Sequence, residues 1–133
     1  PDHANGDVQR LAQQMGVADS VVFTGWRSDI GACLRAADIA VASSIREGLA
    51  LNIVEAMYCG LPVVATDNRG HVPIIRDGEN GFLVHVGDSE TMAQRVLELA
   101  GDAQLREKLT HDDVSRYSAQ AVSERIYEIL KQV

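Results

Sequence analysis

Apolar positions along this chain recur with two different spacings, which predict an alternation of short strands and helices. The short runs typical of buried strands cover Val21–Gly25, Ile39–Ala42, Val63–Ala65 and Phe82–Val84. Stripes of apolar residues with helical spacing lie before, between and after these runs. Strands that alternate with helices predict an α/β fold, a Rossmann-like, doubly wound parallel sheet covered on both faces. We expect a single domain over residues 1–133.

Residues that start or stop helices bound the predicted helical stripes. Gly16 and Gly60 stand where two helices are expected to end. Asp88 and Ser118 are candidate N-caps of later helices. Pro73 suits the first position of a short helix after a turn. The local signals therefore agree with the alternation that the apolar pattern predicts.

Composition narrows the classes of function. The 133 residues are 46% hydrophobic, which fits a globular chain, and the formal net charge is −7. An acidic chain argues against a nucleic-acid partner, because neutralising phosphates needs a basic face. No apolar run approaches the roughly 20 residues of a membrane-spanning helix. Cys33 and Cys59 lack the spacing of a metal or redox motif, so we expect buried, reduced thiols in a cytoplasmic protein.

The stretch Ser43–Asn68 carries the candidate chemistry, because it reads as strand end, loop, helix and next strand. Ligands of open parallel sheets bind beyond the carboxyl ends of the strands. The helix is expected to begin near Ala50, so its free amide groups would favour an anion at Gly48–Leu51. Glu47 and Glu55 could accept hydrogen bonds from sugar hydroxyls. Spacing alone leaves an alternative open, in which Glu47 is an exposed surface residue and Glu55 is a favourable acidic residue near the helix N-terminus.

A resemblance to a known family favours the first interpretation. Residues 47–55 (EGLALNIVE), followed by AM and by CGLPVVAT at 59–66, resemble the E-x7-E signature of retaining glycosyltransferases. More narrowly, they are similar to the family-4-type hexosyltransferases of bacteria, which have the GT-B fold. The segments VFTG at 22–25 and RDGENGFLV at 76–84 resemble neighbouring elements of the same family. The likeness covers essentially the whole chain, in the family's order.

The resemblance implies a role for each matching position. Glu55 would bind the ribose of a nucleotide-diphosphate sugar, and Glu47, expected to be the catalytic residue, would contact the hydroxyls of the donor sugar. Gly48, Leu49, Ala50 and Leu51 would offer backbone amides to the sugar and diphosphate. Trp26 and Arg27 lie where the family holds the base. His71 is expected in a turn, with a ligand contact as the alternative.

The resemblance also implies parts that this sequence does not match. The expected C-terminal, donor-binding domain would lack its first two strands, with the basic residues that grip the diphosphate, and the N-terminal, acceptor-binding domain. We therefore expect a fragment that is inactive alone and that could repair the open sheet by forming a homodimer. No metal and no cofactor are expected, because fixed amides and cations would stabilise the leaving diphosphate.

The predicted activity of the parent protein is retaining transfer of a hexose from a nucleotide-diphosphate sugar, in bacterial polysaccharide or glycolipid synthesis. The acceptor would be a sugar or a lipid-linked sugar, reached at the inner face of the membrane. The alternatives are a nucleotide-sugar-binding or assembly module, and another GT-B enzyme such as a nucleotide-sugar epimerase or a phosphorylase. A dinucleotide dehydrogenase is disfavoured, because no GxGxxG follows a strand.

Overall fold

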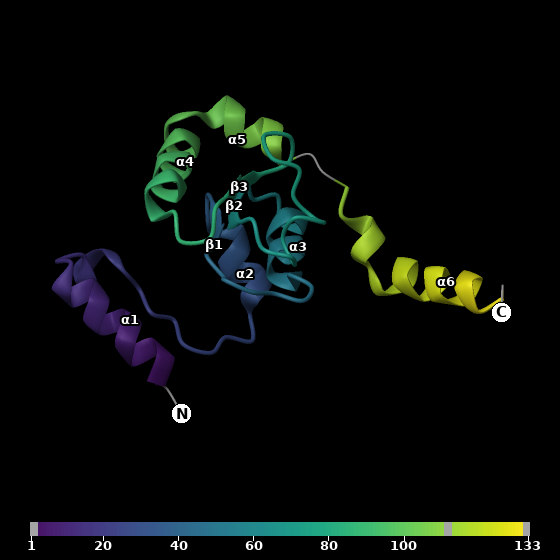
Figure 1. Cartoon of the computed structure of the whole chain (residues 1–133), viewed down its shortest axis with the longest axis horizontal. Coiled ribbons are helices and arrows are strands. Elements are labelled where there is room, and N and C mark those ends of the chain that lie inside the picture. Colours follow the sequence, from purple (N-terminus) through teal and green to yellow (C-terminus); the bar gives the residue numbers. More distant parts are fainter. Residues whose placement is uncertain (1–2, 111–112, 132–133) are drawn as a thin grey trace. The chain divides into compact units, whose positions relative to one another are not determined.

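The computed structural model describes residues 3–110 and 113–131, and its helices and strands follow one another as Figure 1 labels them. The chain forms two compact units, Pro1–Ile30 and Gly31–Val133, which we describe separately. Neither unit, in its described residues, contains a helix that is long and apolar enough to cross a membrane. The single domain expected from the sequence stays a prediction.

The first unit contains α1 (His3–Gln14) and the 3-10 turn η1 (Ala18–Ser20). Gly16 follows α1 with φ at 69°, a conformation that glycine adopts without strain, and its amide donates to Gln13. The strand predicted for Val21–Gly25 is wrong. Its first residue has an extended backbone, but the segment pairs with no described strand and Val22 is 85% exposed. An extended run becomes a strand only when a neighbour accepts its hydrogen bonds.

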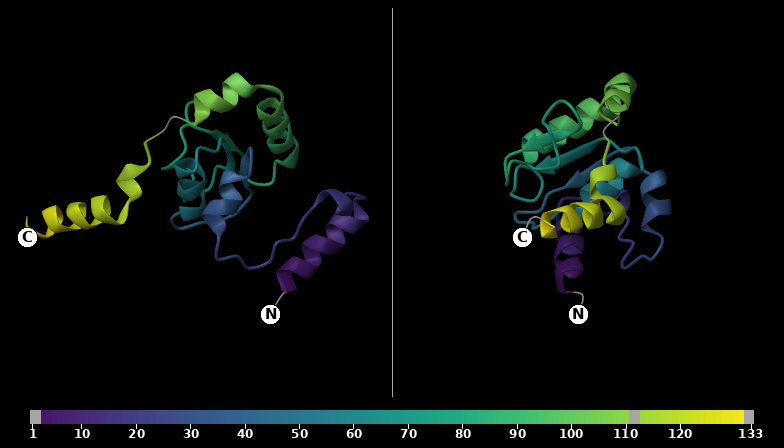
Figure 2. Two further views of the ribbon diagram at one scale, coloured as in Figure 1. Left: turned by 180° about the vertical axis from the view of Figure 1, so that it is seen from behind. Right: turned by 90° about the vertical axis from the view of Figure 1, so that its right-hand side faces the viewer.

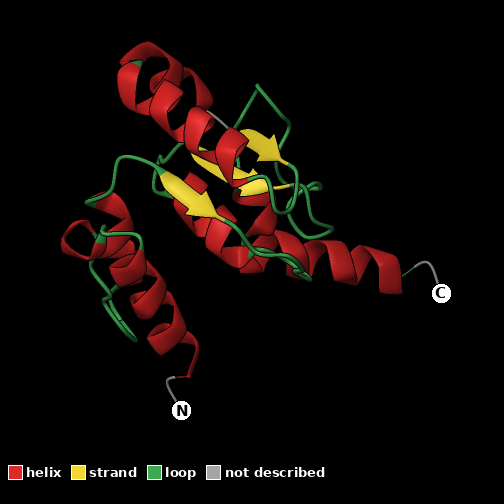
Figure 3. Cartoon of the chain, turned by 60° about the vertical axis from the view of Figure 1, so that its left-hand side comes forward, coloured by secondary structure: helices red, strands yellow, loops and turns green. Residues whose placement is uncertain are grey.

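The second unit is built on a parallel sheet, drawn in yellow in Figure 3. Its three strands, β1 (Ala40–Ala42), β2 (Val63–Thr66) and β3 (Phe82–Val84), lie in the order β1-β2-β3. Both pairs are parallel, and Val64 of β2 aligns with Val41 on one side and with Phe82 on the other. Three of the four predicted strands and their parallel pairing are therefore confirmed.

Two hydrophobic layers cover the two faces of the sheet, so the doubly wound arrangement is also confirmed. The layer under α3 (Leu51–Tyr58) includes Ile53 and Met57, together with Val63 and Ala65 of β2. The opposite layer joins Val64 to helices α4 (Ser89–Gly101) and α5 (Ala103–Leu109), drawn in green in Figure 2. All four residues of β2 are buried, because this central strand is packed on both faces.

The helix boundaries follow the predicted capping residues. The side chain of Asp88 accepts from the amide of Thr91 at the start of α4, and that of Ser118 caps α6 (Ala119–Leu130). Hydrogen bonds from the amide and hydroxyl of Thr91 hold the pKa of Asp88 below its usual value. Gly60, with φ at 78°, ends α3, where the amides of Gly60 and Leu61 donate to Met57 and Ala56. These two bonds form a Schellman motif.

Two expectations about side chains and local structure need correction. Cys33 and Cys59 are free thiols, but each is half-buried and neither is fully enclosed. The short helix predicted to begin at Pro73 is a series of hydrogen-bonded turns over residues 69–74. The side chain of Asn80 explains why these turns do not continue as a helix. It donates to the carbonyl of Ile74 and accepts from the amide of Arg76. Those two groups would otherwise continue a helix.

The remaining elements of the second unit are α2 (Ile30–Arg35), which begins at the boundary residue, and the 3-10 turn η2 (Ser115–Tyr117) before α6. The apolar stripe predicted for α6 is exposed along its described length: no residue of the helix is buried. The stripe consists of Val122, Ile126, Ile129 and Leu130, each 45% to 66% exposed, and Val133 lies outside the described residues.

Candidate functional site

An open pocket lies where the loops that follow β1 and β2 meet. Both loops leave the carboxyl ends of neighbouring parallel strands, which is the edge where such sheets bind ligands. The pocket has a volume of about 520 Å³ and is lined by Ile45, Arg46, Glu47, Gly48, Asn68 and Arg69. The structure thus brings two of the predicted site residues, Glu47 and Gly48, together in one concave site.

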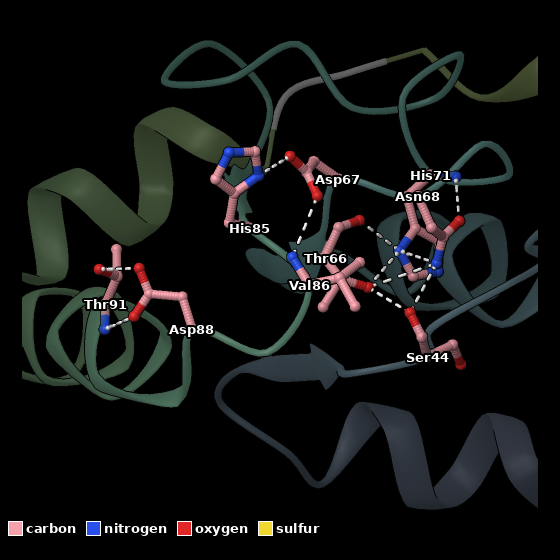
Figure 4. Close-up of polar contacts among 9 residues, drawn as sticks. All are labelled: Ser44, Thr66, Asp67, Asn68, His71, His85, Val86, Asp88 and Thr91. Carbon is pink, nitrogen blue, oxygen red and sulfur yellow. Dashed lines mark hydrogen bonds and ion pairs between the residues drawn. The ribbon is translucent and has the colours of Figure 1, made fainter.

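A buried polar network fixes the two loops to each other, and Figure 4 shows its members gathered around the carbonyl of Ser44. The hydroxyl of Thr66 donates to this carbonyl over 2.6 Å, and the amide nitrogen of Asn68 donates to it over 2.8 Å. Thr66 and Asn68 are 3% and 6% exposed. Hydrogen bonds at these distances inside a low-dielectric interior hold the first loop against the second.

His71, which lies in the loop after β2, completes this network. Its Nδ1 lies 2.7 Å from the carbonyl oxygen of Thr66, so Nδ1 carries a proton and donates it. The side-chain oxygen of Asn68 accepts from the amides of Gly70 and His71, at 2.8 and 3.2 Å. His71 is fully buried, and its Nε2 has no hydrogen-bond partner in the described part of the chain. His71 lies in the predicted turn, but as a core residue and not on the surface.

Glu47 is held from two sides at the rim of the pocket. One carboxylate oxygen accepts from the hydroxyl of Ser44 over 2.8 Å. Gly70 presses against the backbone of Glu47 from the second loop: a Cβ atom at position 70 would lie 2.6 Å from Glu47 Cβ and 3.0 Å from its carbonyl carbon. No side chain larger than hydrogen fits between them. The half-buried Glu47 therefore has a fixed direction with one carboxylate oxygen engaged.

The N-terminus of α3 follows directly. Ala50, the N-cap, is 1% exposed and makes no side-chain hydrogen bond to cap the helix. In the described part of the chain the amides of Gly48, Leu49 and Ala50 donate to no protein group. The amide of Leu51, predicted to be free as well, donates to the carbonyl of Leu49 over 3.0 Å. Unsatisfied amides at the start of a helix attract anions. The side chains of Leu49 and Leu51 are 57% and 54% exposed, but they carry no hydrogen-bonding group. Polar recognition by these two residues would therefore use their backbone.

Glu55 lies about one turn into α3 with an exposed side chain and does not line the pocket. Trp26 and Arg27 belong to the first compact unit and are described only within it. Trp26 is 89% exposed. The guanidinium of Arg27 donates to Asp29 over 2.8 Å, and this bond holds the pKa of Asp29 below its usual value. The functional roles of these three residues stay predictions.

A second pocket of about 200 Å³ opens on the other side of the β2 end. Asp67 accepts from the amide of Val86 over 3.1 Å and pairs with His85, so it fastens the loop before α4 to the end of β2. The pocket is lined by Ser43, Ile45, Thr66, His85, Val86, Gly87, Asp88, Ser89 and Met92. His85 lies on the surface, as predicted, and its side chain is 85% exposed.

Sequence reasoning did not single out Ser44, Thr66 or Asn68 as parts of one network, nor Arg46 and Arg69 as lining the pocket. The loop at residues 66–71 was recognisable as a strand end, which was the one available signal. Which backbone carbonyl each side chain would reach depends on a contact between residues 22 and 24 positions apart. Residue spacing carries no information about such a contact.

Comparison with known proteins places this site in a family. Residues 2–102 match the family model described as glycosyl transferases group 1. The chain is 50% identical over 101 residues to EpsD of Bacillus subtilis (strain 168), whose name assigns it to the glycosyltransferases, covering 76% of this chain and 26% of EpsD. It is 35% identical over 128 residues to the lipopolysaccharide core biosynthesis glycosyltransferase LpsE of Rhizobium meliloti (strain 1021), covering 93% of this chain and 38% of LpsE.

Solved structures show the same relationship. HepE of Anabaena, in a complex with UDP and glucose, aligns with a TM-score of 0.89 at 28% identity, over 96% of this chain and 36% of that chain. The C-terminal domain of the glycosyl transferase group 1 protein LpcC from Francisella tularensis aligns with a TM-score of 0.75 at 31% identity, over 86% of this chain and 62% of that domain. The fold is that of the C-terminal, Rossmann-like domain of GT-B glycosyltransferases.

The chain spans about a quarter to two fifths of the length of the curated relatives it matches. The family model nevertheless covers most of its residues, from 2 to 102, and includes the strands, the pocket loops and α3. This chain belongs to the glycosyl transferases group 1 family.

Proposed function

We propose that this chain is the donor-binding part of a retaining glycosyltransferase that transfers a hexose from a nucleotide-diphosphate sugar. The observation that carries the proposal is the pocket at the carboxyl ends of β1 and β2. There a fixed Glu47 adjoins the amides of residues 48–50, which precede α3 and donate to no group in the described part of the chain. The HepE structures with UDP and with UDP-glucose support a nucleotide-sugar donor for a domain of this fold. The chain alone would bind the donor without turnover.

Each candidate residue has a distinct part in this proposal. Glu55 accepts hydrogen bonds from the ribose, and Glu47 accepts them from hydroxyls of the sugar. The amides of Gly48, Leu49 and Ala50 face the diphosphate, on which negative charge builds as the glycosyl–phosphate bond breaks. Removing one such donor costs about 2.7–4 kcal/mol of transition-state stabilisation in other enzymes. Trp26 and Arg27 remain the candidates for recognition of the base, a role that stays a prediction, and the reaction uses neither a metal nor a cofactor.

The biological setting is proposed from the relatives. LpsE is named for lipopolysaccharide core biosynthesis, and a Mycobacterium leprae relative is a phosphatidyl-myo-inositol mannosyltransferase. By analogy, we assign the acceptor to sugars or lipid-linked sugars of bacterial polysaccharide or glycolipid synthesis. We further propose that the parent protein meets such acceptors in the cytoplasm, at the inner face of the membrane.

Glu55→Ala is expected to weaken UDP binding by tenfold or more, since a hydrogen bond to a charged group contributes about 1.5–3 kcal/mol. Isothermal titration of the chain with UDP measures the change. Glu107→Ala, which removes an equally exposed glutamate from α5, is the matched control and should bind like the parent chain. Equal UDP affinity of Glu55→Ala and the parent chain would refute the ribose assignment.

The open edge of the sheet supports a homodimer of this chain. β1 pairs only with β2 among the described strands, and Val41 is 51% exposed. Ala40 donates from its amide toward the β2 side, to Pro62 over 3.0 Å, so the polar backbone groups of Val41 point to the open edge. An unpaired edge is a template for a strand of another molecule. A second copy can add its own β1 across a twofold axis.

Val41→Lys is expected to convert the dimer into a monomer, because a lysine on an edge strand blocks pairing. Sedimentation velocity at equal protein concentrations measures the change. Leu97→Lys on α4, at a position that is 71% exposed, is the control and should leave the dimer intact. A parent chain that sediments as a monomer would contradict the proposed dimer.

A further inference from the structure

Two arginines from different loops line the same pocket. Arg46 precedes Glu47 in the loop after β1, and Arg69 lies between Asn68 and Gly70 in the loop after β2. In the described part of the chain neither guanidinium makes an ion pair or a hydrogen bond. Arg10, Arg76 and Arg95, in contrast, each pair with a carboxylate three residues away. Among the described arginines Arg35 and Arg125 also make no ion pair, but neither lines this pocket.

The charge of the pocket is opposite to that of the chain. The charged residues of its lining are two arginines and one glutamate, a sum of +1, whereas the whole chain carries −7. One oxygen of Glu47 is already bound by Ser44. Two guanidinium groups in one pocket repel each other unless an anion lies between them. A neutral sugar needs hydroxyl partners and does not explain two unpaired cations.

The backbone that carries these arginines is rigid. Asn68 and Gly70 are both buried, and they are joined by a 2.8 Å hydrogen bond, so the backbone on either side of Arg69 is fixed. Arg46 is followed by Glu47, whose backbone packs against Gly70. Both side chains are exposed to the pocket and to solvent. Two planar guanidinium groups that extend from fixed backbone positions can close on the oxygens of a phosphate, which arginine binds through parallel hydrogen bonds.

We propose that Arg46 and Arg69 together bind a phosphate group that lies beside the transferred sugar. The inference rests on the proposed function in one respect: Glu47 marks the position of the sugar, and the phosphate lies across the same pocket. Phosphate is the shared chemistry of two sources. It belongs either to the diphosphate of the donor or to a phosphorylated acceptor, such as a lipid-linked sugar phosphate.

The first arm of the test uses inorganic phosphate on the whole chain, at constant ionic strength, followed by amide chemical shifts in NMR spectra. Phosphate is expected to shift the amides of the two pocket loops. Arg46→Gln and Arg69→Gln should each weaken phosphate binding by about tenfold, because a charge-assisted hydrogen bond contributes about 1.5–3 kcal/mol. Arg125→Gln on α6 is the matched control, which removes an exposed arginine elsewhere and should change nothing.

The second arm distinguishes the two sources with UDP and uridine. If the donor supplies the phosphate, the double variant Arg46→Gln/Arg69→Gln loses UDP affinity but not uridine affinity, and phosphate competes with UDP. If the acceptor supplies it, the double variant binds UDP normally, and phosphate still binds when UDP saturates the chain. Urea unfolding of the double variant verifies that it is folded, as expected for two exposed positions.

The outcomes separate this inference from the proposed function. If the double variant binds phosphate and UDP as the parent chain does, while Glu55→Ala loses UDP, the phosphate site is refuted and the donor function stands. If phosphate binding depends on both arginines while UDP does not bind at all, the phosphate site stands and the donor function fails. A parent chain that binds neither phosphate nor UDP refutes both.

Discussion

Gly70→Ala is expected to displace the Glu47 loop and to remove sugar recognition. The added methyl group would lie 2.6 Å from Glu47 Cβ and 3.0 Å from its carbonyl carbon, so the backbone of one loop must move. Overpacking of this kind typically costs about 1–3 kcal/mol of stability. We expect the variant to fold with a lower free energy of unfolding, and its affinity for UDP-glucose to fall to that for UDP.

The measurements for this variant are urea unfolding and paired titrations with UDP and UDP-glucose. Gly101→Ala is the matched control, because a Cβ atom at that helical position meets nothing within 4 Å. It should retain or slightly raise stability and leave both affinities unchanged. If Gly70→Ala keeps the parent chain's stability and its preference for UDP-glucose, the contact between the loops does not position Glu47.

Asn68→Ala is expected to cause the second large effect, a loss of about 2–4 kcal/mol in the free energy of unfolding. The side-chain amide of Asn68 donates through Nδ2 to the carbonyl of Ser44. Its Oδ1 accepts from the backbone amides of Gly70 and His71. Alanine leaves the amide of Gly70 without its acceptor and the carbonyl of Ser44 without one of its donors in a buried site, where a lost partner carries a desolvation penalty. The amide of His71 keeps its bond to the backbone carbonyl of Asn68 over 3.1 Å. Loss of the bond from Asn68 to Ser44 also releases the loop after β1. The affinity for UDP-glucose should therefore fall together with the free energy of unfolding.

Chemical denaturation and UDP-glucose titration measure this result. Asn52→Ala, on the exposed side of α3, removes the same side chain without a buried partner and serves as the control. Asn68→Asp separates the two roles of the amide, since it keeps the acceptor for Gly70 and His71 but loses the donor to Ser44. An Asn68→Ala variant as stable as Asn52→Ala would show that the network contributes nothing.

Local signals were sufficient to predict much of the fold. The start of α3 at Ala50, its end at Gly60 and the caps Asp88 and Ser118 depend on residues within one turn of each boundary. Three buried strands were recognisable because each is enclosed on at least one face. Residues 21–25 have an apolar pattern but no partner strand in the described structure, and pattern alone does not supply one.

The candidate site was predictable only in part. Glu47 and Gly48 were placed correctly at a strand end, because the order of strand, loop and helix fixes that position. The burial of His71 was not predictable, since it depends on the Thr66 carbonyl and on the turn packed around it. Sequence reasoning did not single out Arg46 and Arg69, which the structure places in one pocket without a partner among the described residues.

The contact of Gly70 with Glu47 has a consequence for how the two loops respond to a ligand. With only a hydrogen atom between the backbones and with Ser44 hydrogen-bonded to both Thr66 and Asn68, the loops form one rigid body. A ligand that touches either loop meets a surface already in its bound shape, and little conformational entropy is lost on binding. The same rigidity narrows the choice of ligand, because neither loop can move alone to admit a larger sugar.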